Sequence, residues 1–179
     1  MAAGGPIRCP RVLVYVGAMS SPADLEKHAD AIRKDLAVPK QNEVFECAAE
    51  AGFLAANSDG VVDDEEREML VSAIETLSQG AVIEWEADTL IETCAERAKK
   101  DGGGKRAEAV GARLKELGQP EAGLLFAAFV AQASGGIDKQ ESAVLHAIGK
   151  AAGVTKQKVT ALLKRVGAAD PEGPKSVKG

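Results

Sequence analysis

The chain has 179 residues, the length of one domain or at most two small ones. Hydrophobic residues make up 45% of it and aromatic residues only 3%, and this alanine-rich composition favours closely packed helices over a sheet. The net charge of −5, from 27 acidic and 22 basic residues without a basic stripe, excludes nucleic acid as an expected partner.

The cysteines and the apolar segments define the expected compartment. Cys9, Cys47 and Cys94 are an odd number without a Cys-x-x-Cys pair, which indicates reduced thiols and no zinc site. The apolar run at 12–16 follows a proline and is too short for a secretion signal. No segment approaches the roughly 20 apolar residues that a membrane span needs. We therefore expect a cytoplasmic protein with no direct membrane insertion.

Apolar residues recur at helical spacing along most of the chain. Residues 1–20, rich in glycine and proline, are expected to form a partly irregular arm, and residues 167–179 a disordered tail. Between them, periodicity and start and stop signals predict helices at 21–36, 41–57, 63–78, 84–100, 105–117, 120–133, 138–152 and 155–166. The predicted fold is all-α, a compact bundle of seven or eight short helices over residues 21–166.

The chain also matches itself when it is shifted by 75 residues. Residues 60–66 then align with residues 135–141, Leu54 falls on Phe129, and Leu70 falls on Leu145. Each copy reads as a helix, a glycine turn, an aliphatic residue, an Asp cap and a second helix. This pattern predicts an internal repeat in which two helix pairs, at 41–78 and 120–152, are related by a pseudo-two-fold axis.

The first copy carries a short acidic motif. Residues 57–66 read Asn-Ser-Asp-Gly-Val-Val-Asp-Asp-Glu-Glu, which is similar to the Asp-Gly, aliphatic, Asp, x, Glu-Glu signature of the TerB tellurite-resistance family. That family also occurs as an N-terminal module of some membrane-anchored DnaJ-like co-chaperones. The resemblance covers about residues 40–166. It implies a TerB-like binding or scaffold module in the response to tellurite, metal or other chemical stress, with a protein partner among membrane-associated stress-response proteins.

The acidic motif has the composition of a site for a divalent cation. Six carboxylates lie within ten residues, at positions 59, 63, 64, 65, 66 and 68, and calcium and magnesium prefer oxygen ligands. We expect weak binding of calcium or magnesium by Asp59, Asp63 and Glu66, assisted by Asn57 or Asp64. The second copy has Ser134 in place of Asp59, so any charge-dependent chemistry is expected mainly in the first copy.

A second interpretation of the same residues is structural. Asp63 with Glu66, and Asp138 with Glu141, have the spacing of capping boxes, and acids in a first turn complement the helix dipole. The two interpretations are compatible, because one Asp can cap a helix and still present its second oxygen.

The sequence also bears on two further functions, a calcium sensor and an enzyme. A twelve-residue calcium loop with Gly60 at its sixth position has Ala55 at its first, where an Asp is usual, so the alternative function is a degenerate EF-hand-like calcium-responsive sensor. No enzyme is expected, because the sequence shows no nucleophile–base pair, cofactor fingerprint or metal triad. The run Gly102-Gly103-Gly104 resembles a phosphate loop only superficially, since Arg106 replaces the required Ser or Thr.

Overall fold

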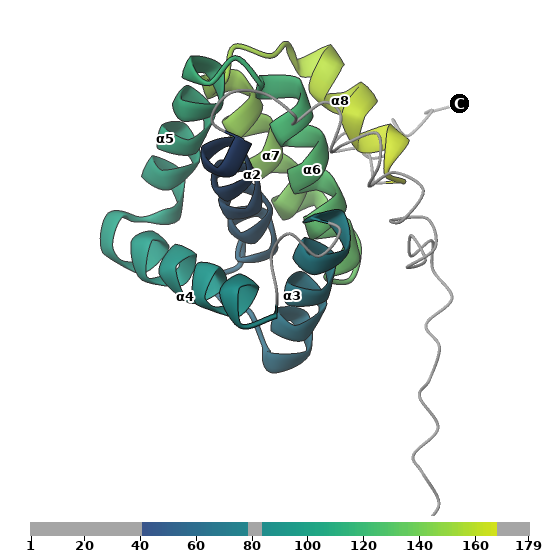
Figure 1. The fold of residues 1–179 in the computed structure, drawn as a ribbon. Coiled ribbons are helices and arrows are strands. Elements are labelled where there is room, and N and C mark those ends of the chain that lie inside the picture. Colours follow the sequence, from purple (N-terminus) through teal and green to yellow (C-terminus); the bar gives the residue numbers. More distant parts are fainter. Residues whose placement is uncertain (1–40, 79–83, 168–179) are drawn as a thin grey trace, which may run out of the picture.

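The protein is described here by a computed structural model covering residues 41–78 and 84–167, and every regular element within them is a helix (Figure 1). The described helices are α2 (Gln41–Ala56), α3 (Asp64–Ser78), α4 (Glu84–Asp101), α5 (Gly103–Glu116), α6 (Pro120–Ala133), α7 (Lys139–Ala151) and α8 (Lys156–Arg165). The predicted all-α bundle is confirmed, and these helices begin and end within two residues of the predicted bounds. The expected arm at 1–20, the helix at 21–36 and the tail beyond Gly167 lie outside the described residues.

Helix α6 is the centre of the bundle. It begins with Pro120 in its first turn, where the missing N–H has no intrahelical acceptor to lose, and its residues 123–132 are all buried. Helices α2, α3, α7 and α8 pack around it (Figure 1). The largest fully buried side chains outside α6 are Leu70, Ile74, Leu77, Leu114, Leu145, Ile148, Val44 and Val110. A helix that is apolar on all sides belongs in such a position, because no face of it gains from contact with water.

Glycine allows the closest helix contacts. A Cβ at Gly52 of α2 would lie 2.7 Å from the Val130 Cβ and 3.2 Å from the Ala127 carbonyl oxygen, both on α6. A Cβ at Gly111 of α5 would lie 2.4 Å from the Ile148 carbonyl oxygen on α7. The distances of 2.7 Å and 2.4 Å are shorter than packed atoms tolerate. At these two points the backbone of one helix therefore lies directly against its neighbour.

The packing has features that a two-fold arrangement predicts. Helix α2 packs on α7, and α3 packs on α6, so each helix pair contacts the other across the bundle. Gly52 and Ala127 are counterparts in the 75-residue shift and meet at the α2–α6 contact. A two-fold axis brings counterparts together in this way. The internal repeat itself remains a prediction, which a superposition of residues 41–78 on residues 120–152 would test.

Replacing Gly52 with alanine tests the α2–α6 contact. Gly52→Ala should lower the free energy of unfolding by about 1–3 kcal/mol, because the new methyl group must push the two helices apart. The matched control is Gly104→Ala in α5, where a Cβ would meet nothing within 4 Å. This change should raise stability by about 0.5 kcal/mol, through the lower backbone entropy of alanine in the unfolded chain. Urea denaturation of both variants measures the two effects, and equal stability of Gly52→Ala and the wild type would contradict the close contact.

Candidate functional site

Two helices begin at acidic caps. Asp63 Oδ1 accepts a hydrogen bond from the Glu66 N–H at 2.8 Å, and Glu66 Oε2 accepts one from the Asp63 N–H at 3.1 Å. At α7, Asp138 Oδ1 accepts from the Glu141 N–H at 2.8 Å, and Glu141 Oε2 accepts from the Asp138 N–H at 2.7 Å. Both predicted capping boxes are therefore formed, and each satisfies N–H groups that have no partner within the helix.

The two capping boxes also influence each other. The pKa of Glu141 is raised from 4.5 to about 7, and the largest cause is burial of its carboxyl group. The hydrogen bond from the Asp138 N–H lowers this pKa, whereas the carboxylates of Asp138, Glu66 and Asp59 raise it further. Residues from both copies of the repeat thus share one electrostatic environment. We call Asp59, Asp63, Glu66, Asp138 and Glu141 the acidic cluster.

Three of the predicted cation ligands belong to this cluster. Asp59 is exposed, and its Oδ1 accepts a hydrogen bond from the Val61 N–H at 3.0 Å. Asp63 and Glu66 form the cap of α3. Asp64 is exposed at the first position of α3, and Asn57 is half-buried in the turn after α2.

The side-chain oxygens of Asp59, Asp63 and Glu66 accept local hydrogen bonds. Within the described residues, no group of three or more His, Cys, Asp or Glu side chains has the arrangement of a metal centre. The cation site therefore stays a prediction about what the cluster can do when a cation is added.

The sequence placed the charge-dependent chemistry mainly in the first copy, and the structure adds Asp138 and Glu141 of the second. Each of them was visible in the sequence as part of a capping box. Their place beside Asp59 and Glu66 follows only from the packing of α7 near the end of α2. The 75-residue shift already pointed to this proximity, because it makes Glu66 and Glu141 counterparts that a two-fold axis can bring together.

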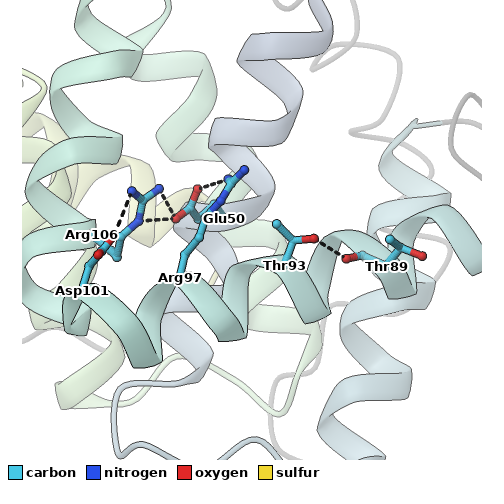
Figure 2. Close-up of polar contacts among 6 residues, drawn as sticks. All are labelled: Glu50, Thr89, Thr93, Arg97, Asp101 and Arg106. Atoms are coloured by element: carbon cyan, nitrogen blue, oxygen red, sulfur yellow. Dashed lines mark hydrogen bonds and ion pairs between the residues drawn. The ribbon is translucent and has the colours of Figure 1, made fainter.

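A second buried carboxylate, Glu50 of α2, was missed in the sequence. Its side chain is only 4% exposed and lies between two arginines (Figure 2). Arg106 of α5 donates to Oε1 from Nε at 2.8 Å and from Nη2 at 2.6 Å, and Arg97 of α4 donates to Oε2 at 3.1 Å. Asp101 lies 3.6 Å from the Arg106 guanidinium on its other side. Both oxygens of Glu50 are paired, so this network joins α2, α4 and α5 and is structural.

The described cysteines are poor nucleophiles. Cys94 is buried, and its pKa is raised to about 12, first by burial and then by the negative charge of Glu50. Cys47 is half-buried, and burial is again the largest cause of its raised pKa. Both thiols are therefore protonated at neutral pH, and a protonated thiol does not attack. Cys9 lies outside the described residues.

No described helix is long and apolar enough to cross a membrane. No protein-family model matches the chain, and comparisons with curated proteins and with solved structures find no match either. The resemblance to the TerB family thus depends on the residues of the motif alone.

The raised pKa of Glu141 predicts a pH-dependent stability. Between pH 4.5 and about 7 the native state holds a proton that the unfolded chain has released, so Glu141 makes the free energy of unfolding fall as the pH rises through this window. In Glu141→Gln this contribution should be absent, while the amide oxygen still accepts the hydrogen bond from Asp138. Urea denaturation at pH 5, 6, 7 and 8 measures it. The control is Glu108→Gln, an exposed position on α5. The same pH dependence in all three proteins would argue against a proton on Glu141.

Proposed function

We propose that this protein is a non-enzymatic binding module whose acidic cluster attracts a cation, either weakly bound calcium or magnesium or a basic group of a protein partner. One feature carries the proposal: burial, and then the negative charges of Asp138, Glu66 and Asp59, raise the pKa of Glu141 to about 7. Crowded carboxylates favour any positive charge that relieves their repulsion. A proton does so at low pH, and a metal ion or a lysine can do so at neutral pH.

Arg67, the basic residue in the first turns of α3, does not neutralise the acidic cluster. Arg67 donates from Nε to Asp88 at 2.8 Å and from Nη2 to Glu92 at 2.9 Å, and both acceptors belong to α4. Its guanidinium is therefore committed to the α3–α4 contact. This arrangement supports a role for an added cation in compensating the cluster.

The TerB resemblance supports a role in the response to tellurite, metal or other chemical stress, with membrane-associated stress-response proteins as partners. The absence of an enzymatic role is supported by the protonation of Cys47 and Cys94 and by the pairing of Glu50. The EF-hand-like alternative gains nothing from the geometry. Its first ligand position would be Ala55, which lies inside α2, is fully buried and has no ligand atom in its side chain.

A thermal melt with added cation tests the proposal. With 10 mM calcium and a dissociation constant of about 1 mM, mass action stabilises the native state by about 1.4 kcal/mol, which raises Tm by about 3 °C. Asp59→Asn with Glu66→Gln should lose most of this rise, because it removes two charges and keeps the oxygens that accept from Val61 and Asp63. The wild-type response should also be larger at pH 8 than at pH 6, since a proton on Glu141 competes with the metal ion.

The matched control is Glu108→Gln with Glu116→Gln, two exposed acids of α5. It changes the net charge equally and should keep the full calcium response. If the wild-type midpoint ignores both calcium and magnesium, or if both double variants respond as the wild type does, the cluster serves only to cap and solubilise the helices.

A further inference from the structure

A groove lies beside the acidic cluster. Its volume is about 300 Å³, and it is open to solvent between the end of α2, the start of α5 and one side of α7. The lining residues are Leu54, Asn57, Ser58, Gly103, Gly104, Ala107, Ala143, Val144 and Ala147. The apolar members form most of the wall, and glycine and alanine keep it shallow enough for another chain to come close to the backbone.

The acidic cluster adjoins this groove. Ser58, which lines it, immediately precedes Asp59, and Val144 lies one helical turn beyond Glu141 on the same side of α7. The negative charge of the cluster therefore acts at the edge of an apolar surface, where electrostatic attraction is stronger than in open water.

The groove also reaches the first turn of α5, where Gly103 and Gly104 line it, and Gly102 at the start of this helix has no side-chain cap. The partial positive charge of a helix start lies at this side of the groove. The groove is thus lined by apolar and small uncharged residues, and the negative charge of the cluster lies beside it near Ser58 and Val144.

We propose that this groove binds a short amphipathic segment of another protein, in which one or two large aliphatic side chains fill the apolar wall and a neighbouring lysine or arginine lies against the acidic cluster. The proposal rests on the proposed function, because the same cluster supplies the attraction for positive charge. The partner, which the proposed function leaves as any protein with a basic group, is here a basic amphipathic segment.

Size and charge select this occupant. A volume near 300 Å³ is at the small end of ligand pockets, so it accommodates a few side chains of a docked segment and not a drug-sized cofactor. An acidic peptide would meet the repulsion of Asp59 and Glu141. A second copy of the chain, with a net charge of −5, would bring further negative charge to the same end. A basic amphipathic segment is the complement of both the wall and its edge.

The experiment measures fluorescence anisotropy with a labelled twelve-residue peptide that carries leucine and lysine at helical spacing. The full chain is used, and EDTA is present so that metal ions do not contribute. The comparison peptides have serine in place of leucine, or glutamate in place of lysine. We expect saturable binding of the leucine–lysine peptide and at least about tenfold weaker binding of the other two, which corresponds to about 1.4 kcal/mol.

Matched variants locate the binding. Ala147→Leu fills the groove, and Ala161→Leu makes the same change at an exposed position of α8. We expect Ala147→Leu to weaken peptide binding about tenfold or more, and Ala161→Leu to leave it unchanged. Ala147→Leu should keep the calcium response of the melt, which separates the groove from the cation site.

Several outcomes would overturn the groove proposal. They are no binding of the leucine–lysine peptide, equal binding by Ala147→Leu and the wild type, or preference for the glutamate peptide. A concentration-dependent dimer in sedimentation velocity that Ala147→Leu abolishes would instead assign the groove to a second copy. If the peptide binds as expected and calcium has no effect on the melt, the metal-binding part of the proposed function fails and the groove stands.

Discussion

The structure depends on the close contact of α2 with α6 at Gly52. Because Gly52 has no side chain, the two helices approach until a single added carbon would lie 2.7 Å from Val130. Helix α2 leads into the turn at 57–63, which ends at Asp63, and α6 leads into the turn at 134–138, which ends at Asp138. The tight pairing brings the turns to a common region, where the negative charges of Asp59 and Glu66 raise the pKa of Glu141. The acidic cluster is thus a consequence of helix packing.

Two requirements compete within the cluster. A capping box is strongest when its carboxylates are ionised, and each cap contributes about 1 kcal/mol to stability. Partial burial and the three carboxyl groups of Asp138, Glu66 and Asp59 favour the neutral form of Glu141 instead. Ionisation of Glu141 therefore strengthens its cap and at the same time increases the repulsion among the carboxylates beside the apolar groove. Any positive group that enters this region relieves the repulsion without breaking either cap, which is the physical reason to expect a binding role here.

The sequence predicted local features well and long-range ones poorly. Helix bounds and both capping boxes depend on residues within about four positions of each other, and the structure confirmed them. Glu50 and Arg106 are 56 residues apart, and no pattern around Glu50 marks it as a buried ion partner. The proximity of Glu141 to Glu66 and the groove beneath Ala147 likewise exist only after the helices pack. Only the 75-residue shift bears on the proximity of Glu141 to Glu66, because it makes them counterparts. It indicates symmetry and says nothing about charge.

An NMR titration of the Glu141 side-chain carboxyl carbon measures whether both capping boxes form one electrostatic site. We expect a midpoint near pH 7 in the wild type. In Asp59→Asn with Glu66→Gln the midpoint should move down, because two of the surrounding charges are gone while burial remains. A wild-type midpoint near 4.5, or one near 7 that is unchanged in the double variant, would contradict a shared site.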